Sequence, residues 1–177
     1  MNPLLAEDIF IQICYQIKDV RRLIMMEETS KWHKKIIRKN KWIDLSIRIE
    51  NNEDLSCMLK THNFSNLDLS YTAITDKSIF KLINVHTLDL SHTMVTDISV
   101  SKLINVHTLD LMFTEVTDDS VWKLVNAYEL NLSYTTLTDA SVSKLVNVHI
   151  LFFGKTHVTI DCIEKLRSNG CIIYTHK

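Results

Sequence analysis

A short pattern of residues recurs every 21 positions from Phe64 to the end of the sequence. Five triplets mark it: Leu67-Asp68-Leu69, Leu88-Asp89-Leu90, Leu109-Asp110-Leu111, Leu130-Asn131-Leu132 and Leu151-Phe152-Phe153. The triplet Ile172-Ile173-Tyr174 falls on the next position of the same period. Self-similarity at a fixed period of this length indicates a solenoid of stacked units, because so short a unit cannot bury its apolar face alone.

Each repeat is predicted to contain one short strand followed by one short helix. Leu88 and Leu90 alternate with polar residues, which is the period-two pattern of a strand with one buried face. Thr93 is expected to bond backbone groups of the neighbouring turn. Thr96 and Asp97 are expected to cap the following helix, because their oxygens accept hydrogen bonds from the free N–H groups of its first turn.

The helix of each repeat is expected to be short and amphipathic. Its buried face is predicted to consist of Val100, Leu103 and Ile104. Asn105 is expected to end it in the left-handed backbone conformation, which asparagine adopts readily. The last repeat differs, because the polar run Arg167-Ser168-Asn169-Gly170 replaces Val-Asn-Val-His, and we expect this run to form a terminal cap.

The spacing L-x-L-x-x-T-x-V/I of these units resembles the leucine-rich repeat. The resemblance implies an α/β solenoid, with parallel strands on the concave face and short helices on the convex face. It also implies a binding surface rather than an active site. We interpret residues 64–177 as leucine-rich repeats with a C-terminal cap, residues 43–63 as a degenerate first repeat, and residues 1–42 as a separate helical unit.

Composition and charge narrow the classes of partner. The chain has 46% apolar and 23% charged residues, as in ordinary globular proteins. Its net charge of −1 favours neither nucleic acid nor a membrane as a partner. Lys and Arg outnumber Asp and Glu by ten to six in residues 1–49, and acidic residues prevail by fifteen to ten in the remainder. This asymmetry is consistent with two parts of the chain.

Three columns of side chains are predicted to project from the sheet on the concave face, with one residue from each repeat. The leading column consists of Asn66, Thr87, Thr108, Glu129 and Ile150. The central column lies between the two buried strand residues and consists of Asp68, Asp89, Asp110, Asn131 and Phe152. The trailing column follows the strand and consists of Tyr71, His92, Phe113, Tyr134 and Lys155. Met112 precedes Phe113 where neighbouring repeats carry serine, which makes this pair the most unusual point on the face.

These columns favour a target protein with a basic, partly apolar segment. Carboxylates in a row repel one another and attract Lys and Arg, and the rings of the trailing column can anchor apolar groups. The alternative is that duplication alone has copied the aspartates, since Leu-Asp-Leu-Ser is a common form of this repeat. Phe80 and Trp122 on the convex side mark either a second contact surface or partly buried helix positions.

The sequence indicates neither a catalytic centre nor a cofactor or metal site. Cys14, Cys57, Cys162 and Cys171 lack the spacing of zinc ligands, and we interpret them as buried, reduced thiols. His86, His107 and His149 share one column, interrupted by Tyr128, but no carboxylate or thiol completes a metal site, and solvated turn residues are the simpler interpretation. No glycine-rich phosphate loop or activated nucleophile is present. The expected class is a non-enzymatic binding protein.

The first 45 residues follow a helical pattern. The first helix is indicated by apolar residues at helical spacing: Ile9, Phe10, Ile13 and Ile17. A second helix is predicted from Val20 to Glu28. A third is predicted from Lys31 to about Asn40, with Thr29 or Ser30 as its cap. Three such short helices make a marginal core, so they should pack on the solenoid or on a partner. The basic run Lys34, Lys35, Arg38, Lys39 and Lys41 is interpreted as a solvated helix face rather than a nucleic-acid site.

This N-terminal unit resembles the F-box. The opening Leu5-Ala6-Glu7-Asp8-Ile9-Phe10-Ile11-Gln12-Ile13 is similar to the family pattern L-P-x-E-I-L-x-x-I, with Ala6 in place of proline. Ser30-Lys31-Trp32 matches its later V-S-K-x-W in part, and Trp42-Ile43-Asp44-Leu45 follows ten residues on, where the leucine-rich part begins. The two resemblances together cover nearly the whole chain.

The F-box resemblance implies a substrate receptor of a cullin-type ubiquitin ligase. The F-box would bind a Skp-family adaptor through Leu5, Ile9, Phe10, Ile13, Trp32 and Trp42, and the repeats would hold the target. The alternative is a free-standing repeat protein whose N-terminal helices only cap the solenoid. In the first case Ile9, Phe10 and Ile13 should stay partly exposed, and in the second they should be buried against the first repeat.

Two further expectations concern location and assembly. The sequence has neither a signal-peptide pattern nor an apolar run of the roughly 18 residues that a membrane span needs, so we expect an intracellular protein of the cytoplasm or nucleus. Its composition, rich in Ile, Asn and Lys, resembles that of proteins encoded by AT-rich genomes, such as those of large DNA viruses and some protists. If the source is viral, the expected location is the host cell. The final strand, Ile172 to Tyr174, offers an edge through which two copies could associate.

Overall fold

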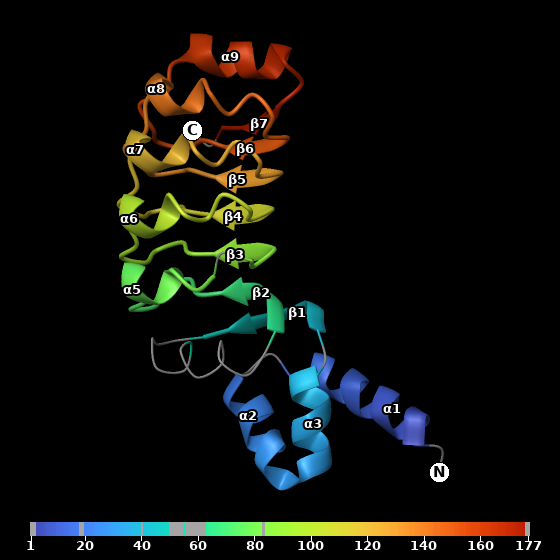
Figure 1. Ribbon diagram of the computed structural model, residues 1–177. Helices are drawn as coiled ribbons and strands as arrows, with labels where there is room; N and C mark the ends of the chain where they lie inside the picture. The colour runs from blue at the N-terminus through green and yellow to red at the C-terminus, as the bar shows by residue number, and fades with distance from the viewer. Residues whose placement is uncertain are drawn as a thin grey trace.

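The repeats stack into a solenoid whose strands form one parallel sheet (Figure 1). The computed structural model describes residues 3–17, 20–39, 41–49, 55, 63–82 and 84–175. The sheet runs in sequence order through β1 (Lys41–Arg48), β2 (Asn63–Asp68), β3 (Thr87–Asp89), β4 (Thr108–Asp110), β5 (Glu129–Asn131), β6 (Ile150–Phe152) and β7 (Ile172–Tyr174). Between β2 and β6 equivalent residues pair at intervals of 21, so the period of the sequence is also the step of the sheet.

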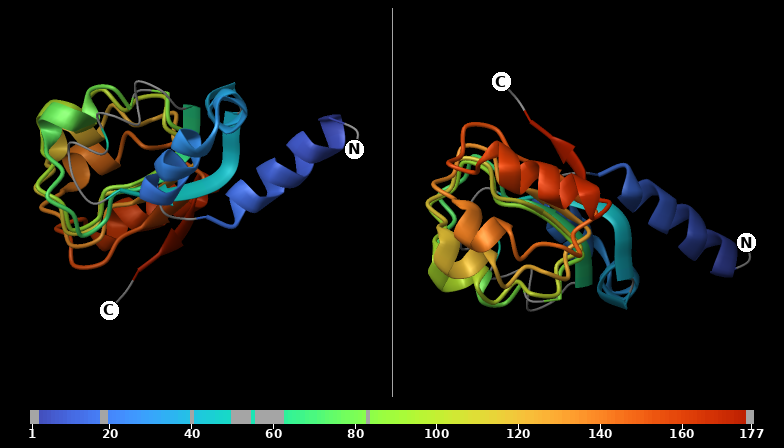
Figure 2. Two further views of the ribbon diagram at one scale, coloured as in Figure 1. Left: turned by 90° about the horizontal axis from the view of Figure 1, so that it is seen from below. Right: turned by 90° about the horizontal axis from the view of Figure 1, so that it is seen from above.

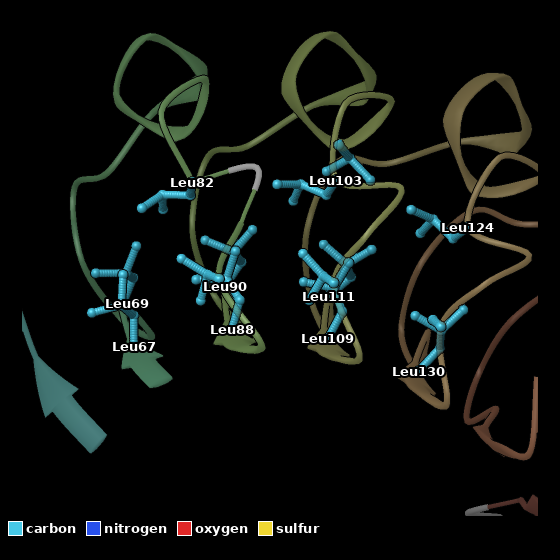
Figure 3. Packing of buried hydrophobic residues seen from close by; sticks show 14 of the residues in the cluster. Leu67, Leu69, Leu82, Leu88, Leu90, Leu103, Leu109, Leu111, Leu124 and Leu130 are labelled. Carbon is cyan, nitrogen blue, oxygen red and sulfur yellow. The ribbon is translucent and has the colours of Figure 1, made fainter. Parts of the chain in front are cut away.

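Short helices form the side of the solenoid opposite the strands (Figure 2). They are α5 (Asp76–Ile79), α6 (Asp97–Val100), α7 (Asp118–Val121), α8 (Asp139–Val142) and the longer α9 (Ile160–Ser168). Between strands and helices lies a core of stacked leucines, in which Leu88, Leu109 and Leu130 face Leu103 and its equivalents (Figure 3). Val100 and Leu103 are buried as predicted, whereas Ile104 is exposed, because the helix ends after a single turn and turns this position outward.

A ladder of aspartates joins each repeat to the next. Asp118 accepts hydrogen bonds from the backbone N–H and the hydroxyl of Thr138 and from the hydroxyl of Ser141, at 3.0, 2.5 and 2.5 Å. Asp76 and Asp97 bond the threonine and serine of the following repeat in the same way. The prediction for Thr96 is confirmed, because its hydroxyl accepts from Ile98 N–H. The prediction that Asp97 caps its own helix is wrong, because its carboxylate bonds the next repeat instead.

The threonines after the strands act within their own repeats. The hydroxyl of Thr93 donates to the carbonyl of Leu90 at 2.6 Å, and Thr72, Thr114 and Thr135 make the same bond. They therefore close the turn of their own strand. The prediction that Thr93 bonds the neighbouring turn is wrong. The reason is that a hydroxyl three residues beyond a carbonyl already lies within hydrogen-bonding distance of it.

The last repeat is one residue longer than the sequence period. Ile173, and not Ile172, pairs with Leu151 and is buried, while Ile172 and Tyr174 face solvent. A shift of one residue reverses the faces of a strand. The cause is α9, whose end has the Schellman arrangement: Cys171 N–H donates to Leu166 O and Gly170 N–H donates to Arg167 O, with Gly170 at φ 94°. Arg167 to Gly170 thus forms the C-terminal end of α9, and the cap of the solenoid expected of this polar run stays a prediction.

Arg167 also covers part of the outer edge of β7. Its Nη2 donates to the carbonyl of Ile173 at 3.4 Å, and its Nη1 pairs with Glu164 at 2.9 Å. A charged side chain on an edge strand hinders pairing with another chain. Self-association through this edge therefore stays a prediction that would require Arg167 to move.

The N-terminal unit consists of α1 (Pro3–Tyr15), α2 (Val20–Thr29) and α3 (Lys31–Lys39). The second and third are close to their predicted ranges, whereas Ile17 of the first helical pattern lies beyond the end of α1. Ser30 caps α3 by accepting a hydrogen bond from His33 N–H at 3.0 Å. Leu23 of α2 and Ile37 of α3 are fully buried, and Glu27 pairs with Arg38 at 3.0 Å. These contacts bind α2 to α3. None of the described helices is long and apolar enough to cross a membrane.

The boundary between the two predicted parts falls within β1. This strand pairs with β2 and has an irregularity between Trp42 and Ser46. Residues 50–54 and 56–62 of the degenerate repeat lie outside the described residues, so its extent stays a prediction. Cys14, Cys162 and Cys171 are buried free thiols, and Cys57 lies outside the described part. Burial raises the pKa of the Cys14 thiol to about 11, which suits a structural position.

Candidate functional site

The central column lies on the solvent face of the parallel sheet. Strand pairing places Asp68 beside Asp89, Asp89 beside Asp110, and Asp110 beside Asn131. Each acid also has a local role. Oδ1 of Asp89 accepts from the N–H and the hydroxyl of Ser91, at 2.9 and 2.7 Å, and so stabilises the turn after the strand. The recurrence of aspartate is thus explained in part by turn formation, as the alternative to a binding role had proposed.

The surroundings of the second carboxylate oxygen, Oδ2, differ from one aspartate to the next. Oδ2 of Asp68 pairs with Nη1 of Arg48 at 3.2 Å, and Oδ2 of Asp110 accepts from the amide of Asn131 at 2.9 Å. Among the described residues, no donor bonds Oδ2 of Asp89. The charge of Asp68 is therefore neutralised by Arg48, and Asp110 is bonded to an amide. Oδ2 of Asp89 is left accessible to a further donor.

Asp110 is electrostatically distinct from its neighbours. Burial raises its pKa above the usual value, with a smaller contribution from the charge of Asp89, and the hydrogen bonds from Met112 N–H and Asn131 only partly compensate. Asp68 and Asp89 each accept an additional bond from a serine hydroxyl, and Met112 replaces that serine in the repeat of Asp110. The sequence had marked Met112 only as an unusual apolar residue.

We expect Met112→Ser to lower the pKa of Asp110. The new hydroxyl would donate to the Asp110 carboxylate, as Ser91 does to Asp89, and a hydrogen bond to the charged form favours ionisation. The shift should be about one pKa unit, measured by carboxyl-detected NMR titration of wild type and variant. An unchanged titration would show that the missing hydroxyl does not set this pKa.

The trailing column adopts an uncommon backbone conformation. Tyr71, His92, Phe113, Tyr134 and Lys155 all have φ between 54° and 58°, the left-handed region in which a side chain is strained. The predicted left-handed residue, Asn105, does not have this conformation. The turn forces it instead at the residue after Ser91, where the Asp89 carboxylate and the Thr93 hydroxyl close a tight bend.

Four rings of this column form one continuous stack. Centroid distances are 4.0 Å from Tyr71 to His92, 4.4 Å from His92 to Phe113 and 4.1 Å from Phe113 to Tyr134. Stacked pairs stabilise by about 0.5–1.5 kcal/mol each, which offsets part of the roughly 1–2 kcal/mol per residue that the left-handed backbone costs. The inner rings thus present their edges rather than their faces, so the predicted cation–π anchoring is limited to the end faces of the stack.

A second ring stack lies just before the strands, whereas the trailing column lies after them. His86, His107, Tyr128 and His149 follow one another at centroid distances of 4.4, 4.9 and 4.9 Å. Tyr128 continues this column and does not interrupt it, because a phenol stacks on imidazole as well as a second imidazole does. Within the described residues, no group of three or more His, Cys, Asp or Glu is placed to hold a metal ion.

The arrangement of strands and helices in this chain is similar to that in known structures. Internalin C2 of Listeria monocytogenes has a TM-score of 0.57 and 17% sequence identity, over 81% of this chain and 74% of that chain. Internalin F of the same organism has a TM-score of 0.53 and 18% identity, over 73% of this chain and 38% of that chain. The fold is a leucine-rich-repeat solenoid. No protein-family model matches the sequence, and no curated protein matches it.

The convex side of the repeats carries the two exposed rings Phe80 and Trp122. Trp122 is 42% exposed but lies under two lysines, with the ammonium groups of Lys123 and Lys144 at 5.6 and 5.1 Å from its ring. Phe80 is equally exposed and lies two repeats away. The two predicted convex residues are therefore not one patch.

The predicted adaptor-binding residues divide into exposed, buried and undescribed side chains. Ile9, Ile13 and Trp32 are exposed by 49%, 50% and 41%. Phe10 is buried, and its ring lies 4.4 Å from His33 and 5.3 Å from Trp32. The side chains of Leu5 and Trp42 lie outside the described part. The prediction that Phe10 stays partly exposed is therefore wrong, because this ring holds α1 against α3.

Proposed function

We propose that the chain is a non-catalytic receptor, in which the N-terminal helices bind a Skp-family adaptor of a cullin ubiquitin ligase and the repeats bind a target protein. The observation that carries this proposal is the exposure of Ile9 and Ile13 on α1, together with Trp32 on α3. Large apolar side chains exposed together on a small helical unit favour a partner surface.

The arrangement of the helices supports two separate binding surfaces. α1 points away from the stacked repeats in both views of Figure 2. The concave face lies on the sheet, whose strands precede the convex helices in each repeat. On the target, the aspartates favour a basic segment with apolar groups.

We expect the purified chain to bind a eukaryotic Skp-family adaptor with micromolar or tighter affinity in calorimetry. The double variant Ile9→Asp/Ile13→Asp should weaken binding at least about 100-fold, because it places two charges in an apolar contact. Phe10 is not a suitable test position, since its replacement would disrupt the helical unit. The control is Ile98→Asp/Ile160→Asp, which alters two exposed isoleucines on the repeats and should bind like wild type.

A free-standing repeat protein is the second candidate function. It is favoured by the burial of Cys14, Leu23 and Ile37 in the same apolar cluster as Ile49 and the repeat leucines. In this case the helices cap the solenoid, and a folded wild-type chain would fail to bind the adaptor. Equal weakening by the control variant would also contradict the adaptor proposal.

A further inference from the structure

The concave face changes character along the solenoid. On β2 to β4 its central column is acidic. On β6 and β7 the solvent-facing strand residues are all apolar or aromatic: Ile150, Phe152, Ile172 and Tyr174. The rings of Phe152 and Tyr174 stack at 4.8 Å, and Ile172 and Tyr174 are 43% and 49% exposed. We call these four residues the apolar end. Ile172 and Tyr174 were not among the predicted site residues, because only the one-residue shift of β7 brings them outward.

Arg48 shows within this chain how a guanidinium lies on the acidic column. It bonds Oδ2 of Asp68 and the carbonyl of Ser70, both at 3.2 Å. The corresponding Oδ2 of Asp89, one strand further, is open among the described residues, whereas Asp110 is bonded on both oxygens. A second cation on this face therefore has one carboxylate available to it.

We propose that the concave face binds an extended segment that places one Lys or Arg on Asp89 and one large apolar side chain on the apolar end. The inference rests on the target-binding part of the proposed function and specifies the ligand of that surface. Charge complementarity sets the direction in which the bound segment lies along the solenoid. Asp89 attracts the basic group, and Lys155, exposed beside the apolar end, repels a second one.

The strand spacing fixes the separation of the two groups. From β3 to β6 there are three steps of about 4.8 Å, or about 14 Å. An extended chain rises about 3.3 Å per residue, so the basic and apolar residues are about four positions apart. Residues four apart on an extended chain point to the same side, so both can face the sheet.

Two labelled peptides of equal composition test this spacing by fluorescence anisotropy at low salt. In Arg-Ser-Gly-Ser-Leu-Ser-Gly-Ser-Arg the groups are four apart in either direction, and in Ser-Gly-Ser-Arg-Leu-Arg-Ser-Gly-Ser they are adjacent. We expect the spaced peptide to bind the full chain roughly tenfold more tightly. Equal affinities would overturn the proposed spacing while leaving the acidic face as a general site for basic segments.

Four variants locate the two contacts. Asp89→Asn and Tyr174→Ser should each remove the advantage of the spaced peptide. Asp119→Asn removes the same charge on the convex side, and Phe80→Ser removes an exposed ring on that side. Both controls should keep the advantage within about twofold. Adaptor calorimetry on the same preparations separates the two proposals. If the wild-type chain binds the adaptor but does not bind the spaced peptide, only the inference about the ligand is overturned.

Discussion

Leu109→Ala is expected to lower the free energy of unfolding by about 3–4 kcal/mol. Leu109 is 1% exposed and lies in β4, where it pairs with Leu88 on one side and Leu130 on the other. Removing three carbon atoms from a packed core costs their transfer free energy and leaves a cavity. Because each repeat is stabilised mainly by its neighbours, a cavity in a central repeat weakens two interfaces at once.

Urea unfolding followed by circular dichroism measures this effect. The control is Ile98→Ala, which truncates an isoleucine that is 64% exposed on the neighbouring repeat and should change stability by less than about 0.5 kcal/mol. A loss below about 1 kcal/mol for Leu109→Ala would contradict the packed leucine core. A broadened transition in the variant would show that the two ends of the solenoid unfold separately.

Asp118→Ala is expected to lower the free energy of unfolding by about 2–4 kcal/mol at neutral pH. The change removes three hydrogen bonds to the next repeat and leaves the hydroxyl of Ser141, which is buried, without its acceptor. The adjacent Asp119 is the matched control, since it lies in the same helical turn but is exposed. Asp119→Ala should stay within about 0.5 kcal/mol of wild type.

The effect of Asp118→Ala should depend on pH. Burial tends to raise the pKa of Asp118, but hydrogen bonds from Ser141 and Thr138 outweigh it and lower the pKa below the usual value. A carboxyl whose pKa is lower in the folded state stabilises the fold above its unfolded pKa, about 3.9, and this contribution disappears as pH falls through the folded value. Urea unfolding at pH 7 and below pH 4 should therefore show the difference between wild type and variant shrinking in acid. A constant difference would mean that the carboxylate is not the group responsible.

The strand and core positions were predictable from the sequence. Leu88, Leu90, Val95 and Leu103 are buried as their spacing indicates, and the prediction of a leucine-rich-repeat solenoid is confirmed. These features follow from local periodicity, because a residue that recurs every 21 positions meets its own equivalents when the units stack. The resemblance of residues 1–42 to an F-box is not tested by the fold of the repeats and stays a prediction.

The candidate site could be predicted only in outline. The sequence identified which residues share a column, but the partner of each aspartate depends on its neighbours in space. Asp68 meets Arg48 from 20 positions earlier, and Asp110 meets Asn131 from 21 positions later. Asp89 differs from both only because neither of these donors reaches it. No local pattern around Leu88-Asp89-Leu90 distinguishes it from the other repeats.

The sequence by itself determined the period, the buried leucines and the order of strand and helix, because these depend on spacing along the chain. Only the tertiary structure decided the left-handed conformation of the trailing column, its continuous ring stack and the outward turn of Ile172 and Tyr174. The physical reason is that these features arise between repeats or from competing bonds within one turn. The Asp89 carboxylate and the Thr93 hydroxyl close the turn and place His92 in a strained conformation, and the length of α9 shifts β7 by one residue.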